Sequence, residues 1–209
     1  MTRSPAPHFS TKQRILDVAE ALFAEHGFAG TSLRLVTSQA EVNLAAVNYH
    51  FGSKDNLITE VFRHRMDAMS QARLERLEHA RKVPNVVLEE VLRAFIEPAL
   101  ALSLDRDGGG AFVRVLARAY AERNERLRTF LSDNYGHVLR EFSRTLAHCL
   151  PALDKEALYW RLDFLAGALT YAMADFGLLR RDTHADEKAH CERAAAELVS
   201  FAAAGFRAG

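Results

Sequence analysis

The stretch from Thr31 to Leu57 most constrains what this chain can fold into. Its pattern predicts a short helix, a tight turn and a second short helix, followed by the capped start of a third helix. Asn43 is a favourable N-cap for the second helix, residues 44–51, and Gly52 ends it. This helix has few apolar side chains and adds an amide, a phenol and an imidazole. Such a helix is not buried on all sides, and we expect it to lie against another polar polymer.

The rest of the chain has helical spacing of its apolar residues, and no stretch alternates as a strand would. We therefore predict an all-α fold of about nine helices. Ser10 caps the first helix, and Gly27 ends it in a left-handed conformation. A helix that begins after Ser53 extends to about Lys82, roughly 45 Å, which is long enough to join two domains. The last five helices are predicted at about residues 86–104, 111–120, 125–150, 155–179 and 186–204.

Proline and glycine mark the interruptions of the last five helices. Pro98 is placed to kink its helix, Pro151 ends another, and Gly205 closes the last one. Residues 108–110 are three consecutive glycines, but no strand precedes them and no GKS/T motif follows. A flexible connection is therefore preferred over a phosphate-binding loop.

Charge and composition limit the classes of function. The 209 residues carry a formal net charge of zero, so any affinity for nucleic acid must come from where the charges lie. No apolar run is long enough for a membrane span, and the N-terminus lacks the apolar region of a secretory signal. We expect a cytoplasmic protein without a membrane partner. No nucleophile elbow, zinc signature or phosphate loop indicates an enzyme, and we predict no cofactor.

The two cysteines, Cys149 and Cys191, are far apart in sequence and imply no disulfide framework. We expect packed, reduced thiols, with a redox-sensing pair as the alternative. His184, Asp186, His190 and Cys191 gather near the last predicted helix. Because helix starts are often rich in such residues, an ordinary polar helix start is favoured there over a metal site.

Residues 10–62 carry a resemblance to the TetR family of bacterial transcriptional regulators. Its marks are Ile15–Ala19, Glu25–Phe28 and Tyr49–Lys54, with Thr31-Ser32 and Val42-Asn43 between them. The segment SLRLVTSQAEVNLAAVNYHFGSK looks particularly like the PsrA-type members, which respond to fatty acids. The resemblance implies a homodimeric repressor of an operator in double-stranded DNA, released by a small hydrophobic effector such as a long-chain fatty acid or acyl-CoA. A non-lipid effector, such as a drug or an aromatic compound, is the alternative.

The resemblance also divides the chain into four parts. Residues 1–9 are a mobile arm, and residues 10–55 are a helix-turn-helix DNA-binding domain. Residues 56–84 are a linking helix, and residues 85–209 are a ligand-binding and dimerisation domain. A helical interaction protein with a vestigial helix-turn-helix is a further alternative, since the net charge is zero.

In a helix-turn-helix, the second helix enters the major groove while the first crosses the DNA backbone. Asn48 is the expected reader of a base edge, and Lys54, beside a helix N-terminus, is placed to bind phosphate. His50 has the alternative role of a histidine packed within the domain. The expected DNA contacts are Thr31, Arg34, Asn43, Ala45, Ala46, Asn48, Tyr49, His50 and Lys54.

Two positions depart from the family pattern. Many members have Gly in the turn where this chain has Glu41, and a Glu there is strained if the backbone needs a positive φ. Many members have Tyr where this chain has Asn48, whose amide can form two hydrogen bonds with an adenine edge. Both departures concern the operator sequence rather than the class of protein.

Two further residue sets follow for the C-terminal part. An apolar effector pocket is expected among aromatic and aliphatic side chains with a basic residue for a head group, namely Phe95, Phe112, Leu116, Phe130, Trp160, Phe164 and Arg118. Small and aliphatic residues of the last two helices permit close approach of a second copy, and this set is Gly167, Ala168, Tyr171, Ala195, Leu198, Val199 and Ala202. Ordinary packing within one chain is the alternative for the second set.

Overall fold

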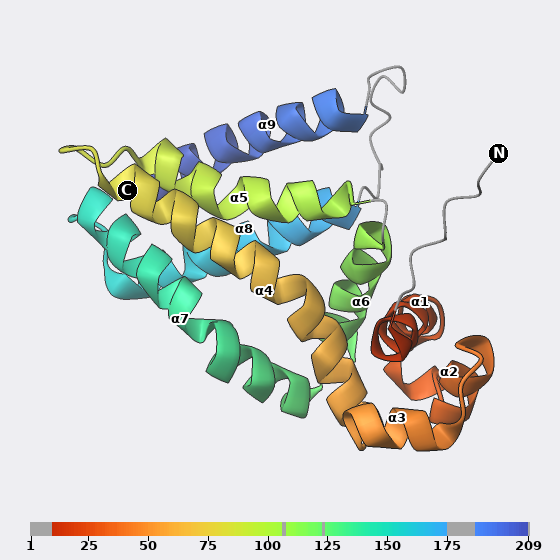
Figure 1. Cartoon of the computed structure of the whole chain (residues 1–209). Helices are drawn as coiled ribbons and strands as arrows, with labels where there is room; N and C mark the ends of the chain where they lie inside the picture. The colour runs from red at the N-terminus through yellow and green to blue at the C-terminus, as the bar shows by residue number, and fades with distance from the viewer. Residues whose placement is uncertain (1–9, 106–107, 123, 175–186, 209) are drawn as a thin grey trace.

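The computed structural model describes residues 10–105, 108–122, 124–174 and 187–208, which form nine α-helices and no strand. The predicted all-α fold is confirmed. The helices are α1 (Thr11–Gly30), α2 (Leu33–Gln39), α3 (Leu44–Phe51), α4 (Lys54–Arg81), α5 (Leu88–Ser103), α6 (Gly109–Ala121), α7 (Glu125–Cys149), α8 (Lys155–Ala174) and α9 (Glu187–Arg207). Helices α1–α3 lie together at one end of the molecule, and α4 runs from them along the remaining helices (Figure 1).

Side-chain caps begin the first four helices, as their sequences predict. The hydroxyl of Ser10 accepts a hydrogen bond from the backbone N–H of Gln13 at 3.1 Å. Ser32, Asn43 and Ser53 cap α2, α3 and α4 in the same way. These bonds satisfy N–H groups that the helices themselves leave without an acceptor.

Gly27 has the predicted positive φ, at 74°. The regular helix is interrupted there, as predicted, and a short further helical turn continues to Gly30 beyond this break. The left-handed residue redirects the chain so that Phe28 returns to the core, where its ring centroid lies 5.4 Å from that of Phe23.

Two hydrophobic cores are built along α4. The first joins α1–α3 to the start of α4, and its fully buried members include Ile15, Phe23, Val47, Leu57 and Phe62. Phe112 and Val115 of α6 and Leu127 of α7 also belong to this core. The second core lies among α4, α5, α7, α8 and α9, and its fully buried members include Leu77, Leu92, Ile96, Phe142 and Leu146. Because α4 contributes to both cores, it connects the two ends of the molecule mechanically.

Two predicted interruptions differ in the structure, and a third stays a prediction. Gly205 does not close α9, since the helix continues to Arg207 and buries Phe206 in the second core. Pro98 lies inside α5 without ending it, and the kink expected there stays a prediction. The three glycines at 108–110 lie at the start of α6 rather than in a loop. Gly109 is the first residue of this helix, and a β-carbon on it would collide with the carbonyl oxygen of Leu102.

Candidate nucleic-acid interface

Helix α3 is a short helix with one buried and one open face. Val47 and Phe51, one turn apart, are buried in the N-terminal core. Ala45, Asn48 and Tyr49 are exposed, and Tyr49 retains 85% of its accessible surface. A spacing of three and four residues places these side chains on one face, so α3 presents an amide and a phenol to the exterior. This is the geometry that a helix needs to enter a DNA major groove.

The other predicted contact residues surround this face. Arg34 on α2 is exposed, while Ala46, His50 and Lys54 are half-buried. Asn43 is exposed, but its side-chain oxygen accepts the N–H of Ala46 at 2.8 Å, so its first role is to cap α3. The contacts brought together are Arg34, Asn43, Ala45, Ala46, Asn48, Tyr49, His50 and Lys54.

The ring of His50 contacts its neighbours on both sides. Its centroid lies 5.1 Å from the Tyr49 ring and 6.0 Å from the Phe51 ring. His50 therefore packs between an exposed ring and a buried one. This placement agrees with the alternative of a bracing histidine as well as with a contact at the edge of the interface.

The expectation that Thr31 contacts DNA phosphate is corrected by the structure. Thr31 is 1% exposed. Its hydroxyl donates to the carbonyl oxygen of Gly27 at 2.9 Å and lies 3.1 Å from that of Leu22. The side chain thus closes the junction of α1 and α2, because it satisfies carbonyl groups that the break at Gly27 leaves near the end of the helix. It cannot reach a phosphate from this position.

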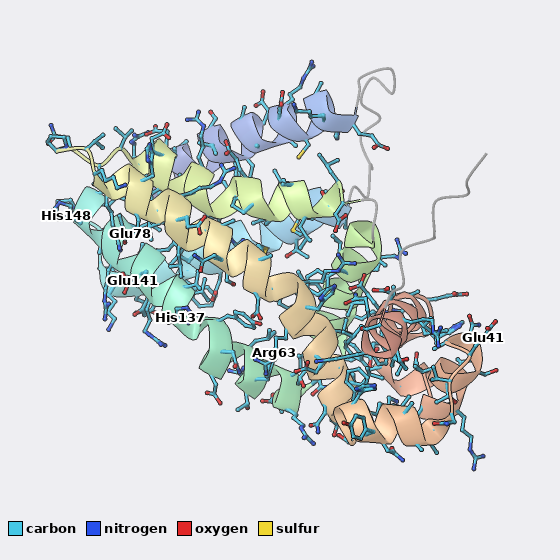
Figure 2. All side chains as sticks on the ribbon, in the orientation of Figure 1. Glu41, Arg63, Glu78, His137, Glu141 and His148 are labelled. Atoms are coloured by element: carbon cyan, nitrogen blue, oxygen red, sulfur yellow. The ribbon has the colours of Figure 1, made fainter. Side chains whose placement is uncertain are left out.

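Glu41 lies in the turn between α2 and α3 with a φ of 52°. It is the only non-glycine with positive φ among the residues that the structure describes. The predicted strain at this position is therefore present. Figure 2 shows Glu41 at the outer edge of the N-terminal helices, on the side away from α7.

Leu44 is a residue of this face that sequence reasoning missed. It begins α3 and is 44% exposed, although an apolar residue at a helix start is ordinarily assigned to the core. The signal was its spacing, because Leu44 lies four residues before Asn48 and thus on the open face. An apolar side chain there suits a thymine methyl group.

The end of α3 is held by contacts from the C-terminal helices. The amide nitrogen of Asn56 donates to the carbonyl oxygen of Phe51 at 2.9 Å. Arg126 at the start of α7 donates to Asn56 Oδ1 at 3.0 Å and to Asp55 Oδ2 at 2.9 Å. The first turn of α4, which holds the end of α3, is therefore connected to α7 by side-chain hydrogen bonds.

A second connection joins α1 to α4 inside the molecule. Arg65 donates to both carboxylate oxygens of Glu20, at 2.8 and 2.9 Å, and to Asp105 Oδ2 at 2.8 Å. Burial raises the pKa of the Glu20 carboxyl, and the Arg65 guanidinium opposes that rise. Gly108, with a φ of 108°, allows this network to form, since a β-carbon there would lie 2.6 Å from Glu20 Oε1 and would also collide with Arg65.

The predicted effector residues lie in different parts of the described fold. Phe95 is buried in the second core and Phe112 in the first, so the two belong to different cores. Leu116 and Phe130 are half-buried against the first core. Arg118 is exposed and donates to the carbonyl oxygen of Glu25 at 3.1 Å, so it holds α6 against α1.

Trp160 and Phe164, the other two predicted pocket residues, lie on the surface of α8. They are 57% and 68% exposed, and their rings stack at 5.8 Å. Phe201 on the neighbouring α9 is 73% exposed. The large exposed aromatic residues of these two helices form what we call the α8–α9 aromatic surface: Tyr159, Trp160, Phe164, Tyr171 and Phe201.

The predicted pairing residues are divided between this surface and the interior. Gly167 and Tyr171 are exposed, and Ala168 and Leu198 are half-buried. In contrast, Ala195, Val199 and Ala202 are buried in the second core of the same chain. For these three, the alternative of packing within one chain is the correct one, because α9 turns this face toward α5 and α8.

The metal site, the cysteine pair and the membrane span considered from the sequence can be compared with the described residues. His184 and Asp186 of the possible metal group lie outside the described residues, as does the arm 1–9. Within the described part, no three His, Cys, Asp or Glu side chains are placed to hold a metal ion. Cys149 and Cys191 are both free thiols. No helix in the described ranges is long and apolar enough to cross a membrane.

Comparison with known sequences places the two halves of the chain in one family. A model described as bacterial regulatory proteins of the tetR family matches residues 15–61. A model described as a tetracyclin repressor-like C-terminal domain matches residues 93–205. The second match alone covers more than half of the chain.

Individual relatives match part of the chain. The HTH-type transcriptional repressor Rv3405c of Mycobacterium tuberculosis is 37% identical over 105 residues, which cover 50% of this chain and 44% of the relative. A probable HTH-type transcriptional regulator of Bacillus subtilis, YttP, is 43% identical over 49 residues, which cover 23% of this chain and 24% of that protein. The chain thus spans less than half the length of these two relatives.

Solved structures resemble the whole chain. The fatty acid degradation regulator FadR of Bacillus halodurans has a TM-score of 0.61 and 17% identity, and the match covers 94% of this chain and 97% of that one. The regulator PfmR of Thermus thermophilus has a TM-score of 0.62 and 18% identity, with 96% and 98% covered. At this level of identity the similarity concerns the fold.

Proposed function

The chain belongs to the TetR family of bacterial regulatory proteins, and from this membership we propose that it is a ligand-responsive transcriptional repressor. It binds a palindromic operator as a homodimer through α3. Residues 10–55 act as the DNA-binding domain, residues 56–84 as the linking helix, and residues 85–209 as the ligand-binding and dimerisation domain. The named relatives are transcriptional regulators and repressors rather than enzymes.

The observation that carries this proposal is the open face of α3. Val47 and Phe51 anchor the helix, and Asn48 and Tyr49 are exposed on its opposite side. An exposed, rigidly held amide on a short helix has little structural purpose of its own. It is suited to hydrogen bonding with a base edge, while Arg34 and Lys54 on either side supply positive charge for phosphates.

Binding to the protein's own upstream region tests this proposal. We expect binding that resists excess competitor DNA at moderate salt, measured by fluorescence anisotropy. Asn48→Ala should change base preference, by about 1–3 kcal/mol of discrimination at one position. Lys54→Ala should weaken binding to all sequences alike, and it should reduce the slope of log binding constant against log salt concentration by about one. Lys82→Ala, at the exposed C-terminal end of α4, is the control.

Binding that competitor DNA removes completely would favour the vestigial helix-turn-helix instead. Equal loss of base preference in the Asn48 and Lys54 variants would contradict the division of roles between them. A loss with Lys82→Ala would show that the assay responds to charge in general.

Pairing of two copies is proposed to use the α8–α9 aromatic surface. Single helix-turn-helix units make few contacts, and two related by a twofold axis read two half-sites. Exposed stacked rings such as Trp160 and Phe164 gain most from being covered, since each large aromatic side chain buries about 150–250 Å². The small residues Gly167 and Ala168, which follow them on α8, permit close helix approach.

Sedimentation velocity tests the pairing surface. We expect Phe201→Asp to shift the protein toward monomer. Leu139→Asp is the matched control, because Leu139 is an apolar residue of α7 that is 50% exposed but lies off the surface. An unchanged dimer with Phe201→Asp, or equal dissociation with Leu139→Asp, would refute this assignment.

For the effector, we propose an amphipathic molecule of the fatty-acid or acyl-CoA class. The support is the resemblance of residues 32–54 to fatty-acid-responsive members and the apolar interior of the C-terminal helices. Native mass spectrometry of the purified protein tests it. A co-purifying acyl chain supports this class, whereas a bound aromatic compound, or an empty protein whose operator complex resists both fatty acid and acyl-CoA, contradicts it.

A further inference from the structure

Three charged side chains are buried among the described residues, and one of them has no counter-charge. Glu20 and Arg65 neutralise each other. Arg73, also on α4, is 8% exposed, and no carboxylate of the described residues forms an ion pair with it. Buried charges are ordinarily paired, because removing a charge from water is costly. Arg73 is therefore an exception within the same helix.

The surroundings of Arg73 use only part of its hydrogen-bonding capacity. Its Nε donates to the carbonyl oxygen of Phe95 at 2.9 Å, and the guanidinium lies 3.9 Å from the centre of the Phe95 ring. The Phe95 ring in turn packs against Phe142 of α7 at 5.1 Å. A guanidinium has five N–H donors, so the four on its terminal nitrogens have no acceptor among the described residues.

These terminal nitrogens keep a small accessible surface. In the described part of the chain, no buried side-chain nitrogen or oxygen lacks a hydrogen-bond partner. The unbonded nitrogens of Arg73 are therefore accessible to a water-sized molecule, although the side chain as a whole is buried. Burial lowers the pKa of Arg73 to about 10, which leaves the group charged at neutral pH. The Phe95 face and carbonyl fix the guanidinium plane, so its outer edge is presented in a defined direction.

We propose that Arg73 is the anchor for the carboxylate of an amphipathic effector that binds among the C-terminal helices. This inference rests on the proposed ligand-responsive function and identifies the chemical group that the site recognises. A carboxylate matches the two terminal nitrogens in bidentate geometry and supplies the missing negative charge. Apolar side chains of the second core, such as Met69, Phe95 and Phe142, suit the rest of an amphipathic molecule.

The place of Arg73 on α4 connects such a ligand to the N-terminal helices. Arg65, which binds Glu20 of α1, is eight residues earlier on α4 and thus about 12 Å away along the helix. The same helix begins at Lys54, directly after α3. A ligand held by Arg73 therefore acts on the helix that positions the DNA-binding face.

The cavity lined by Arg76 is a less suitable carboxylate site. It has a volume of about 440 Å³ and lies between α4, α5 and α9. Its cations are already neutralised, since Arg76 pairs with Glu97, Arg93 with Glu90 at 2.7 Å, and Lys188 with Glu192 at 3.9 Å. Arg76 is therefore the matched control for Arg73, as an arginine of the same helix in a competing cavity.

The test uses octanoate and its uncharged counterpart octan-1-ol as probes, with binding measured by calorimetry. We expect wild type to prefer octanoate, and Arg73→Met to bind octanoate about ten- to a hundredfold more weakly, the range for a charge-assisted pair. Octan-1-ol affinity should stay the same, and Arg76→Met should behave as wild type. Arg73→Lys, which keeps the charge but not the fork, should retain part of the preference.

Each outcome distinguishes the site from the regulator proposal. No octanoate binding by wild type, no preference over octan-1-ol, or an undiminished preference in Arg73→Met that is folded by circular dichroism overturns the site. Loss of the preference in Arg76→Met alone assigns the carboxylate to the other cavity and also overturns it. Operator binding is measured separately on the same proteins, so a protein that recognises octanoate through Arg73 but binds no operator supports the site and refutes the repressor.

Discussion

Replacement of Glu41 by glycine should stabilise the protein. The φ of 52° at Glu41 lies in the left-handed region, where an L-residue with a β-carbon is disfavoured by roughly 1–2 kcal/mol. Glycine removes this strain but loses about 0.5–1 kcal/mol more backbone entropy on folding. The expected net gain in the free energy of unfolding is therefore about 0.5–1 kcal/mol, provided that the exposed carboxylate makes no compensating contact. The Glu41 side chain makes no hydrogen bond or ion pair with the described residues, and only its backbone N–H is bonded, to the carbonyl oxygen of Ser38 at 3.4 Å.

Urea unfolding followed by circular dichroism measures this gain. The midpoint should rise while the slope stays constant, because the surface exposed on unfolding is unchanged. For a chain of this size, a gain of 1 kcal/mol corresponds to about 2–4 °C in the melting temperature. Glu41→Ala is the control, since it removes the same carboxylate and keeps the β-carbon.

The two variants separate backbone strain from charge. Equal stability of Glu41→Ala and Glu41→Gly would refute the strain argument and assign any gain to the lost negative charge. Operator affinity provides the converse comparison. Loss of an acidic group close to DNA should strengthen binding in both variants alike, since that effect does not depend on φ.

Three further predictions concern the interior. Thr31→Val should destabilise the chain by about 1 kcal/mol through its lost hydroxyl hydrogen bonds, with Thr31→Ser as a smaller change in the same unfolding assay. Arg65→Met should cost about 3–5 kcal/mol because it leaves Glu20 buried without a partner, whereas Glu20→Met combined with Arg65→Met should recover most of that loss; equal effects of the single and double changes would contradict the pairing. Burial raises the pKa of the Cys149 and Cys191 thiols. Both should therefore react with iodoacetamide more slowly than free cysteine at pH 7.5, and the rate should increase as the pH rises. Mass spectrometry follows the reaction, and unfolding in urea should abolish the difference from free cysteine.

Most of the N-terminal helices could be predicted because their signals are local. The caps Ser32, Asn43 and Ser53 act within three residues, and apolar spacing fixes which side of each helix is inward. The sequence by itself also indicated that Gly27 has positive φ and that Glu41 is unusual in its turn. The exposed face of α3 followed from the same spacing, apart from Leu44.

The interior polar groups depended on distant parts of the chain. A threonine such as Thr31 is a common phosphate contact, judged by its side chain alone. Only the tertiary structure shows that its hydroxyl is hydrogen-bonded inside the protein, where the carbonyl oxygen of Leu22, nine residues away, approaches it. Arg65 and Arg73 occupy similar positions on α4, and their spacing within its apolar stripe could have identified both as inward. Nothing local distinguishes them, because the partner of Arg65 lies 45 residues away and Arg73 has none among the described carboxylates.

The buried faces of the C-terminal helices could not be predicted from the sequence. α8 and α9 have apolar residues on several faces, so periodicity alone does not say which face meets the chain's own core. Packing against α5 buried Val199 and left Trp160 and Phe164 outside, which reversed their expected roles. Local hydrogen bonding and side-chain spacing thus determined the helices and the DNA-facing surface, whereas the choice of buried face and of charge partner was made by contacts between helices far apart in the chain.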